Sequence, residues 1–258
     1  MSAADWSPDP ALADALQLLL RRRPVLLAFD FDGVLAPIVD EPSAARALDG
    51  TADLLAALAE GDGVHVALVS GRALADLRAV AAVPADSPLL LVGSHGAEFS
   101  SDGAGSGLDD AAADRLAAVR GAFDAVATRF DGVHVETKPA GVVLHTRRAD
   151  RADAASATTA ALEAANMPGC HVTRGKEVVE VSVVEAGKGV ALDRLREQVA
   201  AEGVLYAGDD VTDENAFAVL RPGDIGLKVG DGETLAAHRL PDPPAVQQLL
   251  QHLVALAR

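Results

Sequence analysis

Apolar and polar positions divide most of the chain into two alternating kinds of stretch. Short continuous aliphatic runs, typical of strands buried on both faces, cover residues 25–29, 64–69, 89–92, 204–207 and 224–229. Stretches with apolar residues at helical spacing cover residues 10–22, 51–59, 73–80, 188–199, 212–220 and 244–257. This alternation predicts an α/β fold in which a parallel sheet is covered by helices on both faces.

The pattern changes in the middle of the chain. Residues 100–107 hold three glycines among serine and aspartate, which is typical of a linker. Two helical stretches and two hairpins then alternate, at residues 109–129, 133–146, 150–166 and 171–184. This order predicts a compact α+β cap inserted into the larger sheet. We therefore expect a discontinuous core domain of residues 1–100 and 186–258, and a cap domain of residues 101–185.

The composition fits a folded globular protein and excludes several partners. Half of the 258 residues are apolar, yet no apolar run reaches the ~20 residues that a membrane-spanning helix needs. The net charge of −16 would repel nucleic acid and anionic membranes, and no basic strip offsets it. We expect a small-molecule partner, and the sequence is compatible with a monomer. An anionic substrate would need local cations, and the chain has only four lysines: Lys138, Lys176, Lys188 and Lys228.

Two features bear on cellular location. Residues 1–10 lack the basic start and apolar run of a secretory signal. The single cysteine, Cys170, excludes an internal disulfide, which is consistent with a reducing compartment. We therefore expect a cytoplasmic protein.

Two aspartates directly follow the first predicted strand. Asp30 and Asp32 stand one residue apart before Gly33, and on an extended chain both carboxylates would point to the same face. At close range they repel each other unless a cation offsets their charge, and Mg²⁺ prefers such oxygen ligands. Taken alone, the tetrapeptide is better explained as a solvated turn. Its position after a buried strand, at the carboxyl edge of a parallel sheet, favours a reactive site instead.

Three more polar groups fall at comparable places. Ser70-Gly71-Arg72 follows the second strand, at a helix start that can hold a phosphoryl group or merely cap the helix. Residues 208–214 hold four acids after a later strand, more than helix capping needs, which favours a cation site. Lys188 opens the helix after the predicted cap, where the helix dipole disfavours a cation, so it either has a purpose or points into solvent.

The order and spacing of these groups resemble the four motifs of the haloacid dehalogenase (HAD) superfamily of phosphatases. The residues concerned are Asp30, Asp32, Ser70, Lys188, Asp209 and Asp213. The chain most resembles the trehalose-6-phosphate phosphatase family, at residues 29–38, 70–72, 93–98, 136–138, 144–147, 175–180 and 208–217. The sequence Gly-Asp-Asp-Val-Thr-Asp-Glu, together with Gly-Ser-His-Gly, is the most specific part. The resemblance runs from about residue 25 to residue 229 and implies a HAD-like, Rossmann-type core with an inserted cap.

This resemblance implies a Mg²⁺-dependent hydrolysis of trehalose 6-phosphate to trehalose and phosphate. Asp30 would attack phosphorus to give an aspartyl-phosphate, and Asp32 would transfer protons. Ser70 and Lys188 would hold the phosphoryl oxygens. The metal ligands would be Asp30, the backbone carbonyl of Asp32, Asp209 and Asp213. Asp213 would fix a metal-bound water or orient Lys188.

The same resemblance assigns sugar binding to the cap. Glu136, Lys138 and Glu180 would contact the sugar, and Arg72 and His95 would face the cap from the core. From the alternation alone, Glu136 and Lys138 are simply outward-facing residues of a strand.

Two departures from the family pattern bear on function. Val34 stands where a threonine is common, and Ser182-Val183 replaces a common arginine-proline pair. The second departure concerns sugar contacts. The chemistry motifs do not distinguish between related sugar-phosphate phosphatases, so sucrose phosphate, a phosphoglycosyl-glycerate or another hexose phosphate are alternative substrates. A catalytically idle sugar-phosphate sensor is an alternative from another class, although intact Asp30 and Asp32 argue against it.

Overall fold

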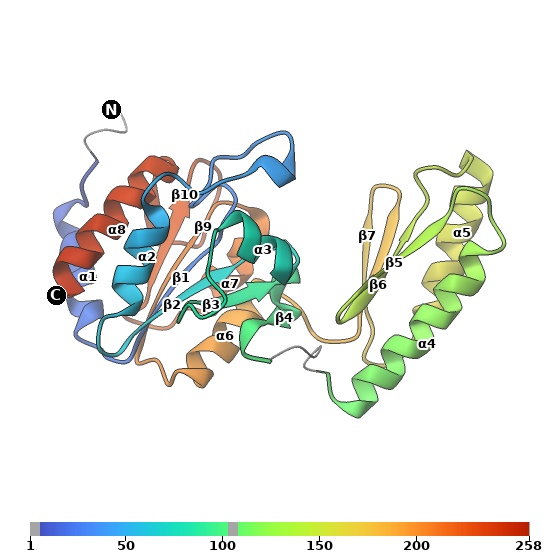
Figure 1. Cartoon of the computed structure of the whole chain (residues 1–258), viewed down its shortest axis with the longest axis horizontal. Helices are drawn as coiled ribbons and strands as arrows, with labels where there is room; N and C mark the ends of the chain where they lie inside the picture. Colours follow the sequence, from blue (N-terminus) through green and yellow to red (C-terminus); the bar gives the residue numbers. More distant parts are fainter. Residues whose placement is uncertain (1–5, 103–107, 258) are drawn as a thin grey trace. The chain divides into compact units, whose positions relative to one another are not determined.

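A computed structural model describes residues 6–102 and 108–257. The chain divides into two compact units: a core, which runs up to Ser101 and resumes at Gly187, and a cap, Asp102–Ala186 (Figure 1). Residues 103–107 of the predicted linker lie outside the described residues. Within the described ranges, no helix combines the length and apolar character needed to cross a bilayer.

The core is built on a seven-stranded sheet of order β11-β10-β9-β1-β2-β3-β4. The bounds are β1 Val25–Phe29, β2 Val64–Val69, β3 Leu90–Gly93, β4 Glu98–Phe99, β9 Gly203–Gly208, β10 Ile225–Val229 and β11 His238–Leu240. All neighbours are parallel except β3 and β4. The sequence pattern predicted the five longer strands but not β4 and β11, whose two and three residues are too few to show a periodicity.

The strand order places a topological switch beside β1. From β1 the chain builds β2 and β3 on one side, and β9, β10 and β11 on the other. Phe29 at the end of β1 is in register with Leu68 of β2 and Ala207 of β9. Segments that follow these strands therefore emerge together at one edge of the sheet, which is where open α/β sheets bind ligands.

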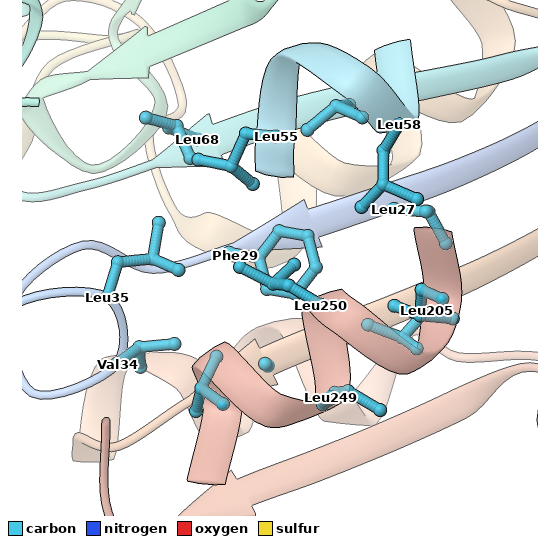
Figure 2. Close-up of a cluster of buried hydrophobic side chains, with 14 of the residues drawn as sticks. Leu27, Phe29, Val34, Leu35, Leu55, Leu58, Leu68, Leu205, Leu249 and Leu250 are labelled. Carbon is cyan, nitrogen blue, oxygen red and sulfur yellow. The ribbon is translucent and has the colours of Figure 1, made fainter. Parts of the chain in front are cut away.

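Helices cover both faces of the core sheet, and the side chains of β1 alternate between them. Leu27 and Phe29 pack in one apolar cluster, whereas Leu26 and Ala28 pack in the other. The first cluster includes residues of α1 Pro10–Leu20, α2 Thr51–Ala59, α3 Leu74–Val80 and α8 Pro243–Ala257. Figure 2 shows Phe29 surrounded by leucines of α2, α8 and neighbouring strands. The second cluster includes residues of α6 Lys188–Gln198 and α7 Glu214–Ala218.

One helix differs from its prediction in a way that matters for the site. The sequence pattern predicts a helix over residues 212–220, but the α-helix α7 begins only at Glu214. A single 3₁₀ turn, Val211–Asp213, precedes it and is capped by Asp210. The tighter turn brings the side chain of Asp213 back onto the loop that follows β9.

The cap is a four-stranded antiparallel sheet with two helices on one face. Its strands are β5 His134–Lys138, β6 Gly141–His145, β7 His171–Gly175 and β8 Val178–Ser182, in the order β5-β6-β8-β7. Helices α4 Asp110–Ala127 and α5 Arg151–Ala164 share an apolar cluster with residues of β6 and β8. The fold class predicted from the sequence, a parallel α/β core with an α+β cap, is confirmed.

Candidate active site

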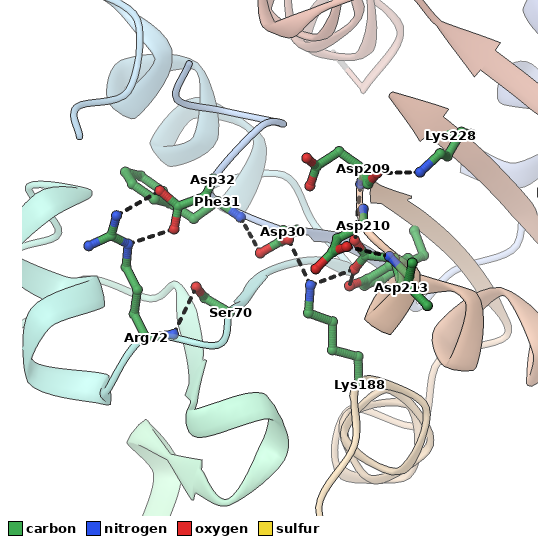
Figure 3. A network of polar contacts seen from close by, with 12 residues as sticks. Asp30, Phe31, Asp32, Ser70, Arg72, Lys188, Asp209, Asp210, Asp213 and Lys228 are labelled. Carbon is green, nitrogen blue, oxygen red and sulfur yellow. Dashed lines mark hydrogen bonds and ion pairs between the residues drawn. The ribbon is translucent and has the colours of Figure 1, made fainter. Parts of the chain in front are cut away.

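Seven of the predicted site residues line one cleft at the carboxyl edge of the core sheet: Asp30, Asp32, Ser70, Arg72, His95, Lys188 and Asp209. The cleft has a volume of about 570 Å³. Asp30 follows β1, Ser70 follows β2, Asp209 follows β9, and Lys188 opens α6. Figure 3 shows these side chains together at the edge of the sheet. The topology therefore gathers residues that are up to 179 positions apart, Asp30 and Asp209, at the switch point.

Lys188 is held between two carboxylates. Its Nζ donates to Asp30 Oδ2 and to Asp213 Oδ1, each at 2.7 Å, and its side chain is only 2% exposed. Burial lowers the pKa of Lys188, but the charges and hydrogen bonds of Asp30 and Asp213 outweigh this and raise it above the ordinary value. The alternative that Lys188 points into solvent is therefore excluded.

Asp30 is almost completely buried. Its Oδ2 accepts from Lys188, and its Oδ1 accepts from the backbone N–H of Phe31 at 2.6 Å. Burial raises the pKa of Asp30 to about 7, against the opposing effect of Lys188. A buried carboxylate of this kind is stabilised in its charged form by any further cation brought into the cleft.

Both oxygens of Asp213 are occupied by protein donors. Oδ1 accepts from Lys188 and from the Tyr206 hydroxyl at 2.6 Å. Oδ2 accepts from the backbone N–H groups of Asp209 and Asp210, at 3.0 and 2.8 Å. These four bonds use the lone pairs that a carboxylate offers, and Asp213 is 0% exposed. Asp213 therefore faces Lys188 and the loop after β9, and it does not line the cleft.

Asp209 packs directly against the turn that follows Asp32. A Cβ built on Gly33 would lie 2.0 Å from Asp209 Oδ2, and Gly33 has a φ of +74°, so only glycine fits here. The backbone carbonyl of Asp209 accepts from the Nζ of Lys228, a buried residue one position before the end of β10. Burial raises the pKa of Asp209 to about 6, and the charge of Asp213 adds to this rise.

Asp32 has a different partner from Asp30. Strand β1 ends at Phe29, so the alternation of a strand does not extend to the two aspartates. Arg72 donates to Asp32 through Nε at 2.6 Å and through a terminal nitrogen at 2.7 Å, a bidentate pair that also raises the pKa of Arg72. In Figure 3 this pair lies away from the contact between Asp30 and Lys188. The family resemblance implied that Arg72 faces the cap, and nothing in the sequence predicted its pairing with Asp32.

His95 and Ser70 are brought to the same side of the cleft. The Ser70 hydroxyl is buried and accepts from the backbone N–H of Arg72 at 3.2 Å. The His95 ring covers Gly71, where an added Cβ would lie 2.5 Å from its Nε2. His95 and Ser94 both adopt positive φ, at 54° and 49°, which is uncommon outside glycine and concentrates at functional sites.

The acidic residues in and directly behind the cleft fit a hard divalent cation. Ligand oxygens of Asp30, Asp209 and Asp213 all lie within 4.8 Å of one another. Oxygen donors of this number suit Mg²⁺, which keeps several of its own waters. Since Asp213 already receives four hydrogen bonds, Asp30 and Asp209 are the carboxylates best placed to hold such an ion.

The three predicted sugar contacts share one face of the cap sheet. Glu136 and Glu180 lie in one cross-strand row, on either side of Val143, and Lys138 stands two residues beyond Glu136. Lys138 Nζ donates to Glu180 Oε1 at 2.6 Å, and Glu136 Oε2 contacts His145 Nε2 at 2.9 Å. Side chains facing this way are not covered by α4 and α5, so the face offers a row of charged hydrogen-bonding groups.

The two departures from the family pattern have structural explanations. Val34 is fully buried among apolar side chains of the core, so its position needs no hydroxyl (Figure 2). The Ser182 hydroxyl donates to the carbonyl of Val184 at 2.8 Å, and Val183 is buried. In this chain the end of β8 is thus held by local hydrogen bonding and packing.

Two buried residues of the site were not among the site residues predicted from the sequence. Tyr206 and Lys228 occupy interior positions of aliphatic strands, where a polar residue breaks the apolar run. That interruption is the signal that could have identified them, because buried polar groups need partners.

Comparisons with known proteins point to one family. Residues 28–237 match the family model described as trehalose-phosphatase. A trehalose-phosphate phosphatase of Mycobacterium avium is 35% identical over 260 residues, covering 94% of this chain and 65% of that protein. One of Mycobacterium tuberculosis is 34% identical over 267 residues, covering 96% of this chain and 67% of that protein.

Two further comparisons extend this finding. An uncharacterized glycosyl hydrolase of M. tuberculosis is 37% identical over 276 residues, which cover 96% of this chain but only 20% of that protein. The chain thus spans between one fifth and about two thirds of the length of these curated relatives. The solved structure of Aspergillus fumigatus trehalose-6-phosphate phosphatase has a TM-score of 0.69 and 27% identity, covering 94% of this chain and 97% of that one.

Proposed function

Because the chain belongs to the trehalose-phosphatase family, we propose that it hydrolyses trehalose 6-phosphate to trehalose and phosphate with Mg²⁺ as cofactor. The observation that carries this proposal is the convergence of Asp30, Ser70 and Lys188 with Asp209 on one cleft. A nucleophile, two phosphate-binding groups and a metal-binding carboxylate are the parts that phosphoryl transfer through a covalent intermediate needs.

In the first half-reaction, an Asp30 carboxylate oxygen attacks phosphorus. The new bond joins Asp30 to phosphorus, while the bond between phosphorus and the sugar oxygen breaks. Asp32 donates its proton to the departing oxygen, so trehalose leaves as the neutral alcohol. This step requires Asp32 to leave the bidentate contact with Arg72, because both its oxygens are engaged there.

In the second half-reaction, water attacks the aspartyl-phosphate. Asp32, now ionised, accepts a proton from the attacking water, and the bond between Asp30 and phosphorus breaks to release phosphate. Asp30 returns to its carboxylate form and Asp32 to its acid form, so the cycle closes without any further reagent.

Positive charge in the cleft has two sources. Lys188 offsets the charge of Asp30 and would bind a phosphoryl oxygen together with Ser70. Mg²⁺ would be held by Asp30, Asp209 and the backbone carbonyl of Asp32, and when bound it supplies charge that offsets the substrate dianion. Of the two roles implied for Asp213, its four hydrogen bonds support the orientation of Lys188.

The sugar would be recognised by the charged face of the cap. Trehalose offers many hydroxyl groups and no charge, and carboxylates and ammonium groups are strong hydrogen-bond partners for hydroxyls. Glu136 and Glu180 would accept from sugar hydroxyls, while Lys138 would donate to sugar oxygens. The bond between Lys138 and Glu180 would keep both charges paired before the sugar binds.

A substrate panel tests the proposal. Purified protein is given trehalose 6-phosphate, sucrose 6-phosphate, glucose 6-phosphate and a small aryl phosphate, each with Mg²⁺ and with chelator, and phosphate release is measured. We expect the highest kcat/KM on trehalose 6-phosphate and loss of turnover with chelator. Preference for another sugar phosphate would show that trehalose 6-phosphate is not the substrate. Full activity in the presence of chelator would overturn the metal requirement.

The same assay separates an enzyme from a sensor. An enzyme releases phosphate in the wild type and not in Asp30→Asn, while the variant still binds trehalose 6-phosphate by calorimetry. A sensor binds the sugar phosphate but shows no turnover in either form.

A further inference from the structure

Tyr206 is a buried polar residue to which the reaction steps above assign no role. It lies in β9, is 0% exposed and packs in the apolar cluster beneath α6 and α7. Its ring meets Phe217 edge-on, with centroids 5.6 Å apart. A phenylalanine would fill this apolar space without needing a hydrogen-bond partner, so the hydroxyl calls for an explanation.

The hydroxyl bonds to the carboxylate that holds Lys188. Tyr206 donates to Asp213 Oδ1 at 2.6 Å, the same oxygen that accepts from Lys188 Nζ. The other oxygen, Oδ2, is fixed by two backbone N–H groups. The hydroxyl therefore adds a fixed donor at the oxygen that faces the lysine, and both oxygens of the carboxylate are held in place.

Lys188 depends on this carboxylate for its position. A lysine side chain has four rotatable bonds, and here its ammonium is fixed by Asp213 on one side and Asp30 on the other. A shift of Asp213 would move the ammonium relative to the Asp30 oxygen that it contacts. Catalytic groups lose much of their effect when they are displaced by as little as ~1 Å.

We propose that Tyr206 is a positioning residue for phosphoryl transfer, which acts through Asp213 to hold the Lys188 ammonium against Asp30. This inference rests on the proposed function. It assigns a role to a residue outside the Asp-x-Asp, Ser-Gly-Arg and Gly-Asp-Asp-Val-Thr-Asp-Glu segments.

The direct test removes only the hydroxyl. Tyr206→Phe is expected to lower kcat about tenfold on both trehalose 6-phosphate and an aryl phosphate, with KM changed less than about twofold, since supporting contacts of this kind typically contribute 10- to 100-fold. Phe217→Leu disturbs the same packing without touching the hydroxyl. This control is expected to lower the melting temperature while leaving kcat within about twofold. Equal kcat in wild type and Tyr206→Phe would overturn the inference.

A double-mutant cycle tests whether the effect passes through Asp213. In an Asp213→Asn background, Tyr206→Phe is expected to change the remaining kcat by less than about twofold, because the group it acts on is already altered. A hydroxyl that served only general stability would cost the same factor in both backgrounds, and that result would contradict the proposal.

A spectroscopic measurement covers the case in which Tyr206→Phe does not fold. The chain has a single tyrosine, so incorporation of 3-fluorotyrosine labels Tyr206 alone. Orthovanadate with Mg²⁺, bound at Lys188, is expected to shift the fluorine resonance, and an unmoved resonance at saturation would overturn the inference. If the wild type hydrolyses no phosphate ester, the proposed function fails first, and that outcome is distinguishable from an active wild type with an equally active Tyr206→Phe.

Discussion

The core and the cap hold their charged residues in opposite ways. In the core, Lys188 and Asp213 are 2% and 0% exposed, and each is fixed by more than one partner. In the cap, the side chains of Glu180 and Glu136 are 40% and 53% exposed, and among the described residues each has a single charged or ring-nitrogen partner. The core network is therefore mutually dependent, whereas the cap residues can exchange their partners for a ligand.

This contrast has an energetic basis. Removing one member of a buried charge network leaves another charge without its partner, at a cost of about 3–5 kcal/mol. An exposed ion pair contributes only about 0–1 kcal/mol, since water replaces the lost partner. A substitution in the buried network of the core therefore disturbs the residues around it. A substitution on the exposed face of the cap changes contacts there without unfolding the protein. We accordingly expect variants of the core to lose catalysis on every substrate, and variants of the cap to lose it selectively.

The largest effect is expected for Asp30→Asn. The amide keeps the volume of the side chain but cannot attack phosphorus, so kcat should fall on the order of 10⁴-fold or more on sugar and aryl phosphates alike. Phosphate release checks the loss, and a melting curve checks that the variant is folded. Turnover within tenfold of the wild type would show that Asp30 is not the nucleophile.

A smaller and selective effect is expected for Glu180→Ala. Hydrogen bonds to charged groups contribute about 1.5–3 kcal/mol, so kcat/KM on trehalose 6-phosphate should fall roughly 10- to 100-fold. The aryl phosphate has no sugar for Glu180 to contact, so its kcat/KM should change less than about twofold. Glu163→Ala, an exposed position on α5, is the matched control and should leave both substrates unaffected.

Mg²⁺ binding is expected to depend on pH. Burial raises the pKa of Asp30 to about 7 and that of Asp209 to about 6, and both must be ionised to hold the cation. Apparent Mg²⁺ affinity should therefore increase from pH 5 to pH 8, by up to about tenfold per pH unit for each proton released. Calorimetric titration at several pH values measures this, and equal affinity at pH 5 and pH 8 would contradict it.

The metal-free protein should show the opposite trend in stability. An unfolded aspartate titrates near pH 3.8, whereas the folded Asp30 and Asp209 keep their protons to higher pH. Between about pH 4 and pH 7 the folded state therefore binds more protons than the unfolded state, so the free energy of unfolding falls as pH rises. Melting temperatures in chelator should decline across this range, and a rise would mean that other groups dominate.

The smallest effect is expected for Lys228→Met. Its ammonium contacts the backbone carbonyl of Asp209 and so supports the loop that carries this carboxylate. We expect Mg²⁺ affinity to fall about tenfold with little change in KM for the substrate, as is typical for supporting contacts of metal ligands. Lys176→Met, at an exposed turn of the cap, is the control. Unchanged Mg²⁺ affinity in Lys228→Met would show that Lys228 does not support Mg²⁺ binding by Asp209.

The sequence predicted the parts of the site that depend on topology. Once β1, β2 and β9 are recognised as parallel strands, residues at their carboxyl ends must meet at one edge. Asp30, Ser70 and Asp209 could therefore be placed together without coordinates. The alternating cap strands likewise predicted that Glu136 and Lys138 share a face.

The parts that were missed depend on packing between distant side chains. The pairing of Arg72 with Asp32 depends on a loop conformation and a choice of rotamers, which no periodicity encodes. Tyr206 and Lys228 were read as members of apolar strands, because sequence alone does not show which buried polar residue has a partner. Val34 was interpreted as the loss of a threonine hydroxyl, whereas its surroundings are apolar and favour the valine.

The central claim is that the core carries out phosphoryl transfer and the cap recognises the sugar, and a single assay can test it. The assay compares kcat/KM on trehalose 6-phosphate and on an aryl phosphate for the wild type, Asp30→Asn and Glu180→Ala. We expect Asp30→Asn to lose both activities and Glu180→Ala to lose only the first. Equal losses of both activities in Glu180→Ala, or any substantial activity in Asp30→Asn, would contradict this claim.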